Sequence, residues 1–194
     1  MPRLRTLCLL TFVTLLPCLV VQAQQAEQPA AAAQKPPEPA VDFAALVARE
    51  FGPDFTLVPK IPPMMLDMNG DGLEDLVLVA GARQALGGSE KFHYTVQDPY
   101  GRYFGYSNPT MSMQFSTDPA AARHLLVIED WKGAKGPKFV LVNIPFDKIR
   151  AGNMLLRKKT IEVVETEDEI GIEAAIYWDG KRFHWEAVGM NQSR

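Results

Sequence analysis

The sequence predicts a mainly β domain of the α+β class: an antiparallel sheet, or a small sandwich or barrel, of about seven strands with one N-terminal helix. Short runs of β-branched and aromatic residues recur between clusters of Gly, Pro, Asn and Asp, which favour turns. One amphipathic stretch precedes these runs, and residues 81–123 lack periodicity and are expected to form a long loop. The expected strands are 55–58, 76–80, 125–128, 138–144, 160–165, 170–178 and 181–186.

Local signals support the helix and the hairpins. Asp42 is suited to cap a helix, and Gly52-Pro53 is suited to end it. The glycine-rich stretch 133–137 can join two strands as a turn. Asp179-Gly180 is a favoured pair for a tight hairpin turn. Antiparallel neighbours are therefore expected around both turns.

The N-terminal part of the chain has the features of an exported protein. Residues 1–23 predict a signal peptide, with a basic start, an apolar run and a small-residue cleavage site. The apolar run is shorter than the roughly 20 residues of a membrane span, so no stable span is expected after cleavage. Residues 24–40 are rich in Pro, Ala and Gln and predict a disordered linker, and 41–190 predict a single domain. The destination is the periplasm or the medium.

Cysteine usage and charge exclude several classes of partner and site. Both cysteines, Cys8 and Cys18, lie within the expected signal peptide, so the exported chain would have no disulfide and no thiolate metal ligand. Pro17 stands where a lipoprotein signal has a small residue, which argues against lipid attachment at Cys18. The net charge of −3 argues against nucleic acid as a partner.

Residues 67–75, Asp-Met-Asn-Gly-Asp-Gly-Leu-Glu-Asp, have the spacing of a cation-binding loop. Asp67, Asn69, Asp71 and Asp75 place side-chain oxygens at loop positions 1, 3, 5 and 9, and Leu73 at position 7 offers its backbone carbonyl. Hard oxygen ligands favour calcium over zinc or copper. The sequence therefore predicts a calcium site, although an Asx-rich hairpin without metal has the same spacing.

The residues that flank this loop distinguish between calcium-binding families. A helix-loop-helix site needs a glutamate at position 12, where this chain has Leu78, and a helix beyond it, where 76–79 is β-prone. Residues 66–78 instead resemble the calcium hairpin of FG-GAP/VCBS-type repeats, in which an oxygen-rich loop joins two strands. The resemblance covers about 20 residues in a single copy, whereas a propeller of such repeats needs several blades. It implies the ligand set of 67–75, without the adhesion functions of that family.

The aromatic content of 81–123 suggests a second hypothesis for the function of the chain. This stretch holds Tyr94, Tyr100, Tyr103 and Tyr106, and clustered aromatic side chains can bind a glycan or a protein. The same rings would equally serve as a small core if the loop packs on the sheet.

A third and weaker hypothesis is that the chain is an enzyme of the hydrolase class. His93, His124 and His184 are far apart in sequence and form no recognisable catalytic pattern with a serine. We therefore expect an exported, non-enzymatic β-rich domain with one weak, structural calcium site. Its partner would be an extracytoplasmic protein or a glycan. The alternative function is recognition of such a partner through the aromatic stretch.

Overall fold

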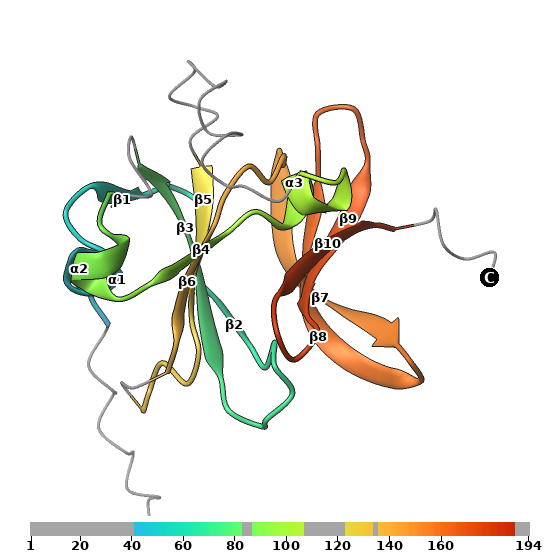
Figure 1. Cartoon of the computed structure of the whole chain (residues 1–194), viewed down its shortest axis with the longest axis horizontal. Helices are drawn as coiled ribbons and strands as arrows, with labels where there is room; N and C mark the ends of the chain where they lie inside the picture. Colours follow the sequence, from blue (N-terminus) through green and yellow to red (C-terminus); the bar gives the residue numbers. More distant parts are fainter. Residues whose placement is uncertain (1–40, 83–86, 107–122, 134–135, 189–194) are drawn as a thin grey trace, which may run out of the picture. The chain divides into compact units, whose positions relative to one another are not determined.

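The computed structural model describes residues 41–82, 87–106, 123–133 and 136–188 (Figure 1). The expected signal peptide, 1–23, and linker, 24–40, lie outside the described residues. The elements are, in chain order, α1 (Phe43–Glu50), β1 (Phe55–Leu57), β2 (Met64–Leu66), β3 (Asp75–Ala82), α2 (Ser89–Phe92), β4 (Thr95–Gln97), α3 (Pro99–Tyr103), β5 (Arg123–Ile128), β6 (Lys138–Leu141), β7 (Lys148–Leu156), β8 (Lys159–Glu167), β9 (Glu173–Trp178) and β10 (Phe183–Ala187).

The strands of the described residues form two sheets. The first has the order β1-β3-β5-β6-β4, and β2 also pairs with β3. Its pairs are antiparallel except for β4, which runs parallel to β6. The second is an antiparallel meander in the order β10-β9-β8-β7. The mainly β, α+β class is confirmed, and neither sheet closes into a barrel within the described residues.

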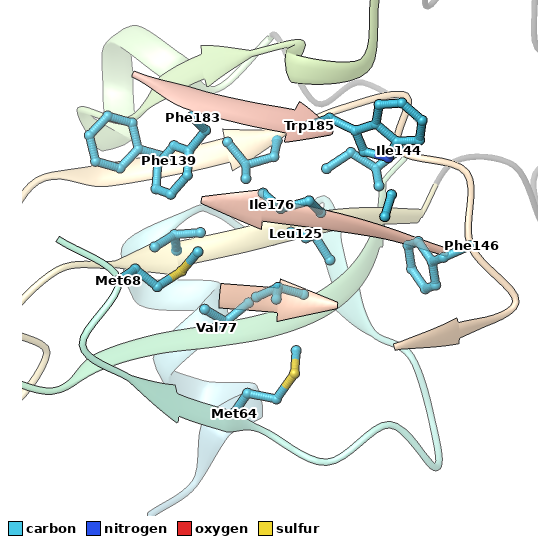
Figure 2. Packing of buried hydrophobic residues seen from close by; sticks show 14 of the residues in the cluster. Met64, Met68, Val77, Leu125, Phe139, Ile144, Phe146, Ile176, Phe183 and Trp185 are labelled. Carbon is cyan, nitrogen blue, oxygen red and sulfur yellow. The ribbon is translucent and has the colours of Figure 1, made fainter. Parts of the chain in front are cut away.

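The largest apolar cluster joins the two sheets (Figure 2). Its labelled members are Met64, Met68, Val77, Leu125, Phe139, Ile144, Phe146, Ile176, Phe183 and Trp185. The rings of Phe139 in the first sheet and Phe183 in the second meet edge to face, with centroids 5.2 Å apart. Since burial of one large apolar side chain stabilises by about 1.5–3 kcal/mol, this cluster is the main attraction between the sheets.

A second cluster covers the opposite face of the first sheet. Val47 of α1 and Phe51 at its C-cap pack there against three leucines of the sheet: Leu76 and Leu78 of β3 and Leu126 of β5. Figure 1 shows α1 and α2 on this side of the sheet, with the second sheet on the other. The predicted cap of α1 is present, since Asp42 Oδ1 accepts a hydrogen bond from the amide of Ala45 at 3.0 Å. The central strands are thus buried on both faces, which explains their continuous apolar runs.

The described residues contain ten strands instead of the expected seven. β7 was absent from the expectation because it is the edge strand of the second sheet and exposes many of its side chains, so its apolar alternation is weak. β2 and β4 have only three residues each. Such short strands carry no measurable periodicity.

The long loop expected over 81–123 contains short helices and a strand in its described part. β3 extends to Ala82, and α2, β4 and α3 follow before residue 107. Asp98-Pro99, a turn signal by composition, caps α3 instead, because the Asp98 carboxylate accepts from the amide of Gly101 at 2.6 Å. Residues 107–122 lie outside the described residues. No helix in the described ranges is long and apolar enough to cross a membrane.

His124 in β5 is a buried titratable residue of the first sheet. Its side chain is 3% exposed, and its ring meets that of Phe55 edge to face at 6.4 Å. Neither ring nitrogen has a hydrogen-bond partner among the described residues. Burial lowers the pKa of His124, and a backbone group of Ala82 opposes this effect. The folded state therefore favours the neutral ring.

We expect acid to destabilise the fold through His124. Because the pKa is lower in the folded state, the unfolded state binds the proton more readily. The contribution of neutral His124 to the free energy of unfolding is fully present above the unfolded pKa of about 6.5. It is lost as the pH drops toward the folded pKa, by up to about 1.4 kcal/mol per pH unit. Urea unfolding of wild type and His124→Leu at pH 7.5 and pH 5 measures this. The variant should lose less stability on acidification, whereas His93→Asn, at an exposed position, should behave as wild type. Equal losses in wild type and His124→Leu would contradict the assignment.

Candidate metal centre

Loop 67–74 joins β2 to β3 and closes a hairpin. The two strands are antiparallel, with Leu66 opposite Asp75. Gly70 and Gly72 have φ angles of +74° and +88°, a conformation that favours glycine and reverses the chain within the loop. Met68 is 2% exposed and belongs to the cluster between the sheets. The strand-loop-strand arrangement expected for these residues is therefore present, and the loop is anchored in the core.

Three of the predicted ligand side chains gather within the loop. Asp67 accepts hydrogen bonds from the amides of Gly70 at 2.7 Å and of Asp71 and Gly72 at 3.0 Å each. Asn69 Oδ1 accepts from the amide of Asp71 at 2.9 Å, and its Nδ2 donates to Asp71 Oδ2 at 3.0 Å. Oxygens at loop positions 1, 3 and 5 thus lie close together.

The other two predicted ligands differ in their surroundings. Leu73 is 49% exposed, and its amide donates to Asp71 Oδ1 at 2.8 Å. Asp75 is fully buried and accepts from the amides of Met68 at 2.9 Å and Asp130 at 3.1 Å. Burial raises the pKa of Asp75, the Asp71 charge raises it further, and the two backbone amides oppose the rise. Asp75 therefore ties both the loop and the end of β5 to β3.

Two glutamates outside the predicted ligand set also meet this loop. Glu129 follows β5 directly, and burial together with the charges of Asp75 and Asp71 raises the pKa of its carboxyl. Glu162 in β8 accepts from the amide of Asp67 at 2.5 Å. Each reaches the loop through strand pairing or sheet packing, which local spacing cannot indicate.

The predicted ligands have the chemistry of a hard-cation site, but their oxygens accept backbone hydrogen bonds in this structure. Among the described residues, no three His, Cys, Asp or Glu side chains are arranged to hold a metal ion. Carboxylate and amide oxygens are nevertheless the ligands that calcium takes. A cation would compete for these oxygens with the loop's own N–H groups.

The four tyrosines predicted as a possible partner-binding site divide into two groups. Tyr94 is 5% exposed and belongs to the cluster under α1, and the Tyr100 ring lies 5.0 Å from that of Trp185. Both therefore serve as core. Tyr103 and Tyr106 are exposed, the latter by 70%, although the Tyr103 ring also meets Trp185 at 5.0 Å.

The histidines show no catalytic trio in the described part of the chain. His184 Nε2 lies 2.7 Å from Asp179 Oδ2, and its ring stacks on Tyr177. Burial acts to raise the pKa of Asp179, but His184 and the amides of Lys181 and Arg182 lower it to about 2. No described serine is found hydrogen-bonded to this pair. We therefore interpret the His184–Asp179 contact as part of the hairpin turn between β9 and β10.

Comparisons with known proteins give no information about this site. No family model, no curated protein and no solved structure matches the chain. The FG-GAP/VCBS resemblance of residues 66–78 therefore stays a prediction.

Asp75→Ala should destabilise the protein even without metal. The change would leave the amides of Met68 and Asp130 without their acceptor, at about 1–3 kcal/mol for each group, so we expect a total loss of about 2–6 kcal/mol. Urea unfolding in the presence of a chelator measures it. Glu74→Ala, at the exposed neighbouring position, should stay within about 0.5 kcal/mol of wild type. An Asp75→Ala variant as stable as Glu74→Ala would contradict the role given to Asp75.

Proposed function

We propose that the chain is an exported, non-enzymatic β-rich domain in which loop 67–75 binds one structural calcium ion. The observation that supports this most directly is the β2–β3 hairpin, whose loop brings the oxygens of Asp67, Asn69 and Asp71 together beside the buried Asp75. Like charges this close repel one another, and a divalent cation would neutralise them.

The proposed ion has a structural role and modest affinity. Binding to the folded state alone adds stability by mass action. The Asp67 and Asp71 carboxylates already accept backbone amides, so the ion must displace or share these hydrogen bonds. We therefore expect a dissociation constant on the order of 10⁻⁴–10⁻³ M, as in extracellular calcium modules.

Calcium should stabilise wild type and fail to stabilise Asp71→Ala. At 10 mM calcium the expected gain is about 1.4–2.7 kcal/mol, which corresponds to several degrees in melting temperature. Thermal unfolding with calcium, with equal magnesium and with chelator measures the gain.

Asp168→Ala is a matched control for Asp71→Ala. Asp168 accepts from the amides of Ile170 and Ile172 at 3.0 and 2.8 Å in another loop. Its removal costs similar turn contacts but should leave the calcium gain intact. Identical melting of wild type with calcium and with chelator would refute the proposed function.

A second candidate function is recognition of a glycan or a protein by exposed aromatic side chains. Tyr103, Phe104 and Tyr106 lie at and just after α3 and are 45%, 55% and 70% exposed. Large aromatic side chains give contact area at low entropic cost, which favours their use in binding.

Tyr106→Ala should separate this candidate from a purely structural role. Because Tyr106 is so exposed, its removal should change stability by less than about 0.5 kcal/mol. If the ring binds a glycan, retention on insoluble cell-wall polysaccharide should fall about tenfold or more. Leu155→Ala, which removes an aliphatic side chain exposed by 72%, is the control and should keep binding. Unchanged retention of Tyr106→Ala would exclude Tyr106 from such a site.

A further inference from the structure

The outer side of β7 is an open sheet edge among the described residues. β7 runs from Lys148 to Leu156 and pairs over its whole length with β8. The second sheet ends at β7, so every other residue of this strand presents its backbone N–H and C=O groups to the outside. Sheet edges are commonly protected by short strands or by proline, whereas β7 has nine residues and no proline. Such an edge is suited to pairing with another chain.

The charges on β7 have partners within its own sheet. Lys148 Nζ lies 2.8 Å from Glu167 Oε1, and Arg150 Nε lies 2.7 Å from Glu165 Oε2. Gly152 leaves room for the Glu165 side chain, because a Cβ at this position would overlap the carboxylate. Unpaired edge cations would protect the strand by repelling a second copy. Here each cation has a carboxylate beside it, which weakens that repulsion.

The sequence of β7 is complementary to itself in one antiparallel register. Two copies related by a two-fold axis pair all nine residues only when Gly152 lies opposite its own counterpart. In that register Ile149 lies opposite Leu155 of the second copy, and Lys148 lies opposite Leu156. No cation therefore meets a cation. A register centred on Arg150 would instead place the two Arg150 side chains opposite each other, which is unfavourable.

Leu155 is the exposed apolar side chain that this register would cover. Its side chain is 72% exposed, and its position in the strand places it on the same face of β7 as Ile149. Ile149 packs against the apolar cluster between the two sheets. Opposite residues of antiparallel strands have their Cβ atoms about 4.5–5.5 Å apart. Leu155 of each copy would therefore contact Ile149 of the other and extend this cluster.

We propose that two copies of this chain associate through β7, paired antiparallel about Gly152, so that their second sheets form one continuous sheet. The partner is a second copy because the residues that complement β7 are those of β7 itself. This inference does not depend on the calcium site. An interface of one strand per copy is small, so we expect a weak dimer with a dissociation constant on the order of 10⁻⁵–10⁻⁴ M.

Sedimentation equilibrium of the exported chain, from about 0.01 mM to about 1 mM, measures this association. Leu155→Lys should weaken the dimer about tenfold or more, because it removes the contact with Ile149 and adds a charge at the paired edge. Ile170→Lys is the matched control, since Ile170 is 81% exposed in the loop between β8 and β9. It should change the dissociation constant less than about threefold. Circular dichroism establishes that each variant is folded.

Oxidation of the double variant Ala151→Cys/Asn153→Cys tests the register. Both residues are exposed, and Ala151 of one copy would lie opposite Asn153 of the other. The double variant should therefore form a disulfide between copies, at the short Cβ separation that this bond requires. Each single variant should form it far less, because neither position lies opposite itself. Cys8 and Cys18 lie within the expected signal peptide, so the exported chain adds no competing thiol.

The outcomes decide both the interface and its register. A wild-type protein that stays monomeric over the whole concentration range would refute the proposal. A dimer that Leu155→Lys leaves intact, or that Leu155→Lys and Ile170→Lys weaken equally, would refute β7 as the interface. Equal cross-linking of the double and single cysteine variants would refute the register about Gly152. Selective weakening by Leu155→Lys together with selective cross-linking of the double variant supports the proposal.

Discussion

Burial of the first sheet on both faces is the constraint from which the candidate site follows. β3 and β5 pack against α1 on one side and against the second sheet on the other. Strands buried in this way have little room for charged side chains along their length, so carboxylates are accommodated best at their ends. Because β3 and β5 are antiparallel, the start of one meets the end of the other. Asp75 and Glu129 are brought together at this end, beside the loop that connects β2 to β3.

The electrostatics of the loop result from this placement. Asp75 has its burial compensated by two backbone amides, whereas Glu129 Oε1 has no such donor among the described residues. Asp67 and Asp71 use amides of the loop itself. Backbone N–H groups thus stabilise part of the negative charge, and the remainder is what the proposed cation would neutralise. Under the proposed function, the same amides would compete with the ion and limit its affinity.

The sequence predicted features that depend on neighbouring residues and missed those that depend on pairing. The Asp42 cap and the spacing of 67–75 are local and can be read from neighbouring residues, and the resemblance of 66–78 to a calcium hairpin implied the strand-loop-strand arrangement. Glu129 and Glu162 reach the loop only through the register of β5 and the packing of β8. β7 was missed for a related reason, since an exposed edge strand has no buried face to impose alternation.

The attachment of the loop argues for a structural ion over a regulatory one. A calcium sensor needs an element that moves when the ion binds. Loop 67–75 is instead held by Met68 in the core, by the Asp75 contact to Asp130, and by Glu162 of β8 at the Asp67 amide. Leu78, where a sensor would carry its position 12 glutamate, is fixed within a strand buried on both faces. Under the proposed function, ion binding would therefore stabilise the existing arrangement of β2, β3 and β5 without displacing any of them.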